Sequence, residues 1–368
     1  MIRVVVVDDS AFMRKAIATM LEKDPLIRVV GSAKNGEEGL QLVREHEPDV
    51  VTLDIEMPVM DGLTALRHIM MEMPRPVLMV SSLTTEGAEA TLKAMELGAV
   101  DFIPKQLSKV SLDIVKIEAD LIAKVKAIAG RRMRPVSHAR PAPVSLPKVA
   151  PERIPTARPW KTTPTTAAGA APAPRGGVQR EVVAIGVSTG GPPAVQKIMA
   201  ALPADFPSAI LIAQHMPAAF TGPFAERLNG LSKLTIKEAE DGDPVRPGHV
   251  YVAPGGKHMT LERRATGMIV RVGTEPASAL YKPSVDVLVS SVAGAAGRRA
   301  LAVILTGMGS DGMLGVRECK ARGGLVLAQS DATCVVYGMP KAVVEDGTTD
   351  RVVDLDDMAA AIVECLYR

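Results

Sequence analysis

The sequence predicts an α/β protein with two domains, each built on a doubly wound parallel sheet. Short apolar runs alternate with amphipathic stretches on both sides of one proline-rich segment. The runs are continuous rather than alternating, which indicates strands that are buried on both faces. A length of 368 residues also fits two hydrophobic cores better than one.

The first domain is predicted over residues 1–125 and holds five candidate strands. These are IRVVVVDD, IRVVGSA, VVTLD, PVLMVSS and VDFIPK. The stretches between them, such as AFMRKAIATMLEKD and EGAEATLKAMELG, place apolar residues at helical spacing. This alternation of strands and helices predicts a five-stranded parallel sheet that is covered on both faces.

We expect residues 126–179 to form an extended, basic linker rich in proline and alanine. Residues 131–178 hold nine Lys or Arg, a single Glu and ten of the 28 prolines. They have no sustained periodicity, and such a composition cannot bury enough apolar surface to offset the entropy of ordering. Because the basic charge is concentrated here, it is weak evidence for nucleic-acid binding by either domain.

The second domain is predicted over residues 180–368 and repeats the pattern on a larger scale. Its candidate strands are VVAIGVS, AILIAQH, LTIKEAE, HVYVAP, ALAVILTG and GLVLAQS. A predicted hairpin, KHMTLERRATGMIVRV, interrupts them. The sequence therefore predicts a larger parallel sheet with an antiparallel element.

Cysteine use and hydropathy narrow the class of protein. The three cysteines form no CxxC pair, which fits a reducing cytosol and argues against a disulfide framework or a thiolate zinc site. The opening apolar run, Val4 to Val7, is too short for a signal peptide or a membrane span. Aromatic residues make up only 3% of the chain, which argues against platforms for stacking bases.

Polar side chains follow the predicted strands of the first domain at one edge of the sheet. Asp8 and Asp9 end the first strand, Asp54 the third and Ser81 the fourth, and Lys105 follows the fifth. Carboxylates gathered in this way repel one another unless a cation is present, and Mg²⁺ is the hard divalent ion that suits them. A hydroxyl and a lysine beside them would hold phosphoryl oxygens. The cluster predicts a site that accepts a phosphoryl group on Asp54, whereas any one Asp alone would suggest a helix cap.

The motifs VDDS, LDIEMPVMDG and DFIPK make residues 1–125 similar to the receiver domain of two-component response regulators. The resemblance implies a flavodoxin-like fold and Mg²⁺-dependent phosphorylation of Asp54. It also implies that Ser81 and Lys105 sense the phosphate. The groups that the resemblance places near the metal are Asp8, Asp9, Asp54 and the backbone carbonyl of Glu56.

The segment GVSTGG, at the start of the second domain, is compatible with several kinds of site. A dinucleotide-binding loop would need a glycine where Ser188 stands, and a Walker loop would need a lysine where Pro192 stands. The segment fits G-x-S-x-G between a strand and a helix, the context in which a tight turn exposes a nucleophilic serine. On this motif alone, a serine that caps a helix is an equally good explanation.

A nucleophilic serine needs a base, and three histidines of the second domain are candidates. His215 ends the strand AILIAQH and falls on the same edge as Ser188. His249 starts a strand, which places it at the opposite edge, and His258 lies at the mouth of the hairpin, where it could line a cleft. The position of His215 favours it as the base.

The base needs a carboxylate that orients it, and two are candidates. Asp311 follows a buried strand through the glycine-rich turn TGMGSDG, whereas Asp286 lies in a predicted helix and suits a surface or capping role. We therefore predict a triad of Ser188, His215 and Asp311. Its chain order differs from that of α/β-hydrolases, so the same geometry would be built on another fold.

The motifs GVSTGGP, QHMP, LTGMGSDG and AQS…VVYGMP make residues 180–366 similar to the catalytic domain of the chemotaxis protein-glutamate methylesterase family. The resemblance implies a cytoplasmic serine hydrolase that removes methyl esters from glutamates of chemoreceptors and deamidates receptor glutamines. It implies no cofactor for catalysis, no membrane insertion and no nucleic-acid partner. A chemotaxis histidine kinase would phosphorylate the receiver, which otherwise packs over the catalytic cleft. We expect the oxyanion to meet the N–H of Thr189 and a group near Met308.

Three other classes of function have to be weighed on the sequence alone. A DNA-binding response regulator would need a compact basic helix-turn-helix after the receiver, but the second domain is rich in strands. A small-molecule esterase would share the triad, because every serine enzyme that transfers acyl groups uses this chemistry. A nucleotide-binding module is disfavoured by the missing glycine and lysine of the phosphate loops.

Overall fold

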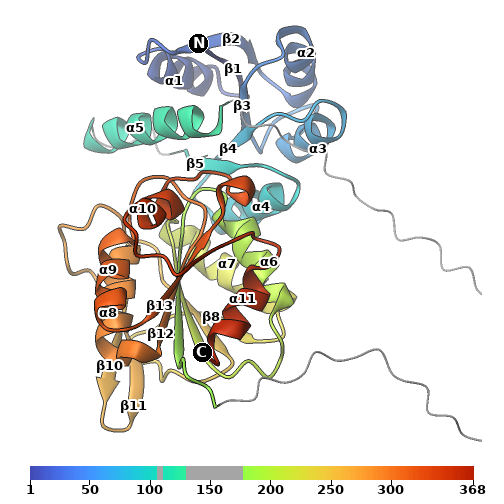
Figure 1. Cartoon of the computed structure of the whole chain (residues 1–368). Helices are drawn as coiled ribbons and strands as arrows, with labels where there is room; N and C mark the ends of the chain where they lie inside the picture. Colours follow the sequence, from blue (N-terminus) through green and yellow to red (C-terminus); the bar gives the residue numbers. More distant parts are fainter. Residues whose placement is uncertain (106–110, 130–176) are drawn as a thin grey trace, which may run out of the picture.

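The computed structural model of the chain describes residues 1–105, 111–129 and 177–368, without the side chains of residues 111–116. Most of the predicted linker lies outside the described residues. Figure 1 shows two α/β units stacked against each other, the first in blue to teal and the second in green to red. None of the helices in the described ranges has the length and hydropathy that crossing a membrane requires.

The N-terminal unit is a five-stranded parallel sheet in the order β2-β1-β3-β4-β5. This confirms the predicted sheet, and the five strands lie where the apolar runs predict them. Its elements are β1 (Ile2–Val7), α1 (Ala11–Leu21), β2 (Ile27–Ala33), α2 (Gly36–His46), β3 (Val50–Asp54), α3 (Gly62–Glu72), β4 (Val77–Ser81), α4 (Thr85–Glu96), β5 (Asp101–Pro104) and α5 (Ser111–Ile128).

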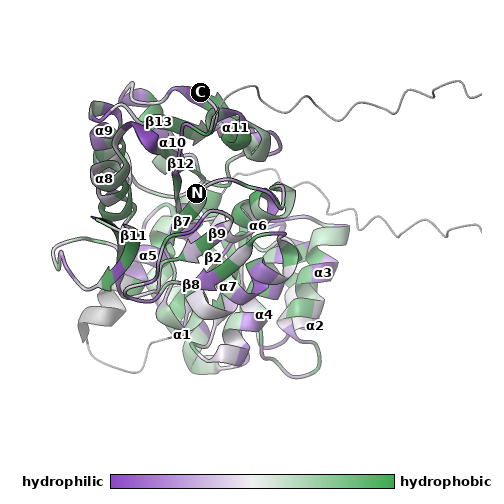
Figure 2. Cartoon of the chain, turned by 90° about the horizontal axis from the view of Figure 1, so that it is seen from below, coloured by the Kyte–Doolittle hydropathy of each residue, from purple (hydrophilic) through white to green (hydrophobic). Residues whose placement is uncertain are grey.

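Local sequence explains where the N-terminal helices begin. The side chains of Asn35, Asp61 and Thr84 accept hydrogen bonds from backbone N–H groups in the first turns of α2, α3 and α4. Figure 2 shows hydrophilic and hydrophobic colours along each of these helices. Such amphipathic helices cover a sheet with one face and meet water with the other.

The C-terminal unit is a seven-stranded parallel sheet in the order β14-β13-β12-β6-β7-β9-β8, with a separate antiparallel hairpin, β10-β11. The predicted class is confirmed, and β14 is a short edge strand that the sequence analysis missed. Its elements are β6 (Val182–Val187), α6 (Gly191–Ala201), β7 (Ala209–Gln214), α7 (Ala218–Leu231), β8 (Thr235–Glu238), β9 (His249–Val252), β10 (His258–Arg264), β11 (Gly267–Gly273), α8 (Val285–Ala296), β12 (Ala300–Ile304), α9 (Met313–Ala321), β13 (Leu325–Gln329), α10 (Met339–Glu345), β14 (Arg351–Val353) and α11 (Met358–Cys365), with two short 3₁₀ turns at Gly297–Arg299 and Asp331–Thr333.

Helices cover both faces of the larger sheet. Helices α8 and α9 pack on one face, and α6, α7 and α11 pack on the other (Figure 1). Successive residues of β6 face opposite sides: Ala184 packs in the α8 layer, whereas Val183 and Ile185 pack in the layer of α6 and α7. Burial on both faces is the reason that these strands appear in the sequence as continuous apolar runs.

The centre of the larger sheet places three chain segments side by side. Strand β6 pairs with β12 on one side and with β7 on the other, and all three run in parallel. The segments that follow them therefore leave the same edge of the sheet. These segments contain Ser188, His215 and the turn that leads to Asp311.

Candidate active site and phospho-acceptor site

Ser188 lies on a tight turn between β6 and α6. Its N–H donates to Thr306 O at 3.0 Å, and its carbonyl accepts from the N–H of Gly191 at 2.8 Å. Gly190 has a φ of 76°, a left-handed conformation that a glycine adopts without strain. A Cβ atom at this glycine would also lie 2.4 Å from Val335. The turn therefore has the form that the G-x-S-x-G pattern predicts.

His215 and Asp311 are paired at the same edge. His215 Nε2 lies 2.8 Å from Asp311 Oδ2, and the two side chains are only 9% and 8% exposed. Burial opposes ionisation of the carboxyl group, but the hydrogen bond with His215 holds the pKa of Asp311 below its usual value. The carboxylate is therefore a charged group that can orient the imidazole.

The N-terminus of α8 surrounds the Asp311 carboxylate with donors. The N–H of Val285 lies 2.7 Å from Oδ2, while the N–H of Asp286 and the hydroxyl of Ser284 lie 2.9 and 3.0 Å from Oδ1. With His215, each carboxylate oxygen thus accepts two hydrogen bonds. A helix N-terminus stabilises negative charge, so the first turn of α8 favours the ionised form of Asp311.

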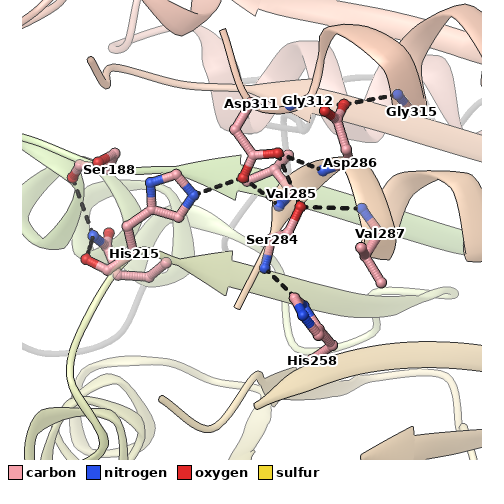
Figure 3. A network of polar contacts seen from close by, with 11 residues as sticks. Ser188, His215, His258, Ser284, Val285, Asp286, Val287, Asp311, Gly312 and Gly315 are labelled. Atoms are coloured by element: carbon pink, nitrogen blue, oxygen red, sulfur yellow. Dashed lines mark hydrogen bonds and ion pairs between the residues drawn. The ribbon is translucent and has the colours of Figure 1, made fainter. Parts of the chain in front are cut away.

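The imidazole has one nitrogen left for Ser188. His215 Nδ1 is buried and has no hydrogen-bond partner among the described residues. In Figure 3, Ser188 lies on the side of the His215 ring that is opposite to Asp311. The structure thus brings the three predicted residues together but forms only the His215–Asp311 hydrogen bond. Hydrogen bonds of this kind are often long before substrate binds and tighten in the complex.

Two side chains that the sequence analysis missed also contact these residues. Gln214 Nε2 donates to the carbonyls of Ser188 and His215, at 3.1 Å each, and so connects the serine turn to the end of β7. The Tyr281 ring stacks on the His215 imidazole, with ring centroids 4.1 Å apart and planes 15° from parallel. Tyr281 comes from the loop before α8, where no periodic pattern could have indicated it.

The two predicted oxyanion residues lie in adjacent turns. The Thr306 hydroxyl donates to the carbonyl of Thr189 at 2.9 Å, and a Cβ atom at Gly307 would lie 2.8 Å from Ser188 Cβ. The turn after β12, which contains Met308, therefore packs directly on the serine turn. Within the described residues, the N–H groups of Thr189 and Met308 donate no hydrogen bond, so both are available to a ligand.

The other candidate residues have different surroundings. His258 is 1% exposed and lines no open cleft; its Nδ1 accepts from the N–H of Ser284 at 3.2 Å. His249 begins β9 at the opposite edge, as predicted. Asp286 accepts from the N–H groups of Gly312 and Gly315, so it caps α9 from a neighbouring helix.

The acidic residues of the N-terminal unit form a compact cluster. Ligand atoms of Asp8, Asp9 and Asp54 all lie within 4.8 Å of one another. Lys105 Nζ lies 2.7 Å from Asp54 Oδ2 and 3.1 Å from Asp8 Oδ2. Burial, reinforced by the charge of Asp8 and opposed by Lys105, raises the pKa of Asp54 to about 6.

The donor set of this cluster fits a hard divalent cation. Asp8 Oδ2 and Asp54 Oδ2 are buried, and among the described residues the Lys105 ammonium is the cation within ion-pair distance of both. Buried carboxylate oxygens that lie this close to one another are suitable ligands for Mg²⁺. Glu56 lines the adjacent pocket together with Asp54, Ser81 and Lys105.

Ser81 connects this pocket to helix α4. Its hydroxyl donates to Gly87 O at 3.1 Å and accepts from the Thr91 hydroxyl at 2.7 Å. The neighbouring Ser82 hydroxyl instead pairs with Thr84 at 3.3 Å. A change in the position of the Ser81 hydroxyl would therefore alter contacts within α4.

The N-terminal unit packs against the candidate active site. The Thr189 hydroxyl donates to Asp101 Oδ2 at 2.6 Å, and the Phe102 and Phe220 rings stack with centroids 4.4 Å apart. Arg227 Nε of α7 donates to Glu96 of α4 at 2.9 Å. Met308 packs against the buried cluster that contains β5 and α5 residues. The N-terminal unit thus contacts the predicted oxyanion residue Thr189 directly.

Comparisons with known proteins agree with this arrangement. The family described as response regulator receiver domain matches residues 4–115, and the family described as CheB methylesterase matches residues 183–362. A protein-glutamate methylesterase/protein-glutamine glutaminase of Nitratidesulfovibrio vulgaris is 66% identical over the full length of both chains. One of Oleidesulfovibrio alaskensis is 64% identical, again over the full length of both. The solved Thermotoga maritima CheB methylesterase catalytic domain is 41% identical, covers 50% of this chain and 98% of its own, and has a TM-score of 0.49.

A receiver-type sheet joined to a larger sheet with a serine, a histidine and an aspartate at its edge defines a response regulator with a hydrolase domain. The chain belongs to the protein-glutamate methylesterase/protein-glutamine glutaminase family. The predicted family is thereby confirmed.

Proposed function

We propose that this chain hydrolyses methyl esters of glutamate side chains on chemoreceptors and deamidates receptor glutamines, under control of receiver phosphorylation. Residues 1–125 form the receiver, residues 126–179 the linker and residues 180–368 the catalytic domain. The observation that carries the proposal is the buried His215–Asp311 pair, with the free Nδ1 of His215 on the side of Ser188.

The geometry assigns a role to each nitrogen of the imidazole. Because Nε2 carries the proton that is donated to Asp311, Nδ1 of the neutral ring is unprotonated and can accept the Ser188 proton. Ser188 then attacks the ester carbonyl, and the imidazolium passes this proton to the departing methanol. Water hydrolyses the glutamyl ester of Ser188 by the reverse proton transfers. With a glutamine substrate, ammonia leaves in place of methanol.

The tetrahedral intermediate carries a negative oxygen that needs donors. The free N–H groups of Thr189 and Met308 lie in turns that pack on each other beside Ser188. A pair of fixed N–H donors lowers the energy of the oxyanion without reorganising in the transition state. The reaction needs no cofactor, since the base, the nucleophile and the donors all belong to the chain.

The contacts between the units support an inhibitory role for the receiver. In the structure, the Asp101 carboxylate accepts a hydrogen bond from the Thr189 hydroxyl, and Met308 packs against a buried cluster that includes receiver residues. A phosphoryl group on Asp54 would attract the Ser81 hydroxyl away from Gly87 and Thr91 of α4. Helix α4 contacts α6 and α7 of the catalytic domain, so its displacement would loosen the receiver from the site.

Mg²⁺ suits the acidic cluster of the receiver. Asp8, Asp9, Asp54 and the Glu56 carbonyl would hold it, and it would neutralise the charge that gathers when a phosphoryl group is placed on Asp54. The phosphodonor would be a chemotaxis histidine kinase, and the setting the cytoplasm.

The test is release of methanol by the full chain from methylated cytoplasmic fragments of a chemoreceptor. Ser188→Ala should remove nearly all turnover, and Asp311→Asn should reduce the rate on the order of 10⁴-fold, as in a well-studied serine-protease triad. Ser278→Ala, at an exposed serine, is the control and should retain the wild-type rate. Hydrolysis of small esters without hydrolysis of the receptor fragments would instead support a small-molecule esterase.

A further inference from the structure

Among the described residues, the Asp311 carboxylate accepts a hydrogen bond from one side chain besides His215, and that side chain is Ser284. The Ser284 hydroxyl lies 3.0 Å from Asp311 Oδ1, on the oxygen that does not contact the imidazole (Figure 3). The remaining two donors are backbone N–H groups of α8. Ser284 is therefore the donor that a substitution can remove while leaving the backbone and the proposed triad unchanged.

We propose that Ser284 is a positioning residue for the reaction: its hydroxyl fixes the plane of the Asp311 carboxylate and thereby the orientation of the His215 ring. The inference rests on the proposed serine-hydrolase function and deepens it. A carboxylate offers about four acceptor positions, and all four are filled here. Loss of the hydroxyl would leave Oδ1 with a single donor, so the carboxylate could rotate away from the geometry that aligns Nε2.

His258 holds Ser284 in place from the other side. Its Nδ1 accepts the N–H of Ser284 at 3.2 Å, so the neutral ring carries its proton on Nε2 (Figure 3). His258 is 1% exposed, and burial lowers its pKa, which keeps Nδ1 an acceptor at neutral pH. A chain of contacts thus runs from the start of β10 through Ser284 and Asp311 to His215.

A purely structural role for Ser284 makes a different prediction. Ser284 is the N-cap of α8, and its side chain accepts from the N–H of Val287 at the long distance of 3.4 Å. If capping were its only role, glycine, which is tolerated at this position, would substitute at little loss of stability and with no effect on turnover. The φ of −101° at Ser284 is open to any residue, so the substitution introduces no backbone strain.

The experiment compares Ser284→Gly, Ser284→Thr and the wild-type full chain in methanol release from methylated receptor fragments. Ser284→Gly should lower kcat about ten-fold with KM unchanged, the size expected for loss of one hydrogen bond to a charged group. Ser284→Thr keeps the hydroxyl and should restore kcat to near the wild-type value. Asn35→Gly removes a comparable cap from α2 of the receiver and should leave kcat unchanged.

A second readout is the pH profile of kcat/KM in the same variants. With one donor fewer, the Asp311 carboxylate attracts a positively charged partner more strongly, so the acidic limb of kcat/KM should move to higher pH in Ser284→Gly. The other titratable groups that face this pair are common to all three proteins. They are Asp286, His258, Tyr281, Asp120 and Lys124.

The two readouts separate failure of the inference from failure of the proposed function. If the wild-type chain releases methanol and Ser284→Gly matches it in kcat and in the pH profile of kcat/KM, Ser284 is only a cap and the inference is wrong. If Ser284→Thr fails to restore kcat, the hydroxyl is not the group responsible. If the wild-type chain releases no methanol from any receptor fragment, the proposed function itself is wrong.

Discussion

The Thr189 hydroxyl donates a hydrogen bond to the Asp101 carboxylate at 2.6 Å, across the contact between the two units. Thr189 follows the proposed nucleophile directly, and Asp101 begins β5 of the receiver. Lys124 Nζ lies 3.2 Å from the same carboxylate oxygen and donates to the Phe102 carbonyl at 2.8 Å. The receiver therefore contacts the candidate active site through a buried, charged network as well as through apolar packing.

Removing this contact should activate the unphosphorylated enzyme. We expect Asp101→Ala to raise basal methanol release by about ten-fold to a hundred-fold, because a buried hydrogen bond to a carboxylate favours the docked receiver by about 1.5–3 kcal/mol. Glu72→Ala, at the end of α3, removes an exposed ion pair with Arg44 of α2 and should leave the basal rate unchanged. An Asp101→Ala protein with the wild-type basal rate would show that this contact does not restrain the enzyme.

The acidic cluster should make receiver stability depend on pH. Folding raises the pKa of Asp54 from 3.8 to about 6, so the carboxylate destabilises the fold where it is ionised. This loss of folding stability is absent below about pH 4 and reaches its full size above about pH 6. After allowance for screening and for the lost Lys105 ion pair, Asp54→Asn should stabilise the receiver by about 1–2 kcal/mol at pH 7. Urea unfolding of both proteins at pH 4 and pH 7 measures this change in unfolding free energy. A change of equal size at the two pH values would contradict the account.

Mg²⁺ should stabilise the receiver through the same carboxylates. Because the ion binds the folded cluster, a concentration ten times its Kd should add about 1.4 kcal/mol to the unfolding free energy. Thermal unfolding with and without Mg²⁺ measures this gain, which should be largely lost in Asp8→Asn. The control Glu37→Gln, at an exposed position on α2, should keep it. If Mg²⁺ increased the unfolding free energy of Asp8→Asn by the same amount, the ion would have to bind at another site.

Buried strands were the most predictable part of the fold. Strands such as Val4–Val7 and Val182–Val187 are buried on both faces, and each left a continuous apolar run. Strand β14 has three residues, of which only Val353 is buried. It therefore lacks the continuous apolar run by which the other strands were predicted. The predicted triad residues each follow a buried strand or its turn, which is why their shared edge could be inferred.

Contacts between distant loops could not be inferred in this way. Ser284 and Asp311 are 27 positions apart, and their hydrogen bond depends on how α8 packs beside the turn after β12. Tyr281 lies in an irregular segment, so its stacking on His215 had no sequence signal. His258 begins the hairpin as predicted, but packing of β10 against α8 buries it, so it does not line an open cleft as expected.

The most direct test is the rate at which a fluorophosphonate, which labels activated serines, modifies the full chain with and without a small phosphodonor and Mg²⁺. The account predicts that the label is found on Ser188 and that phosphodonor increases its rate of attachment. In Asp54→Asn the slow basal labelling should persist and the increase should disappear. Labelling of another serine would contradict the assignment of Ser188 as the nucleophile. If the rate of labelling at Ser188 did not change when the phosphodonor was added, control of the site by the receiver would be contradicted.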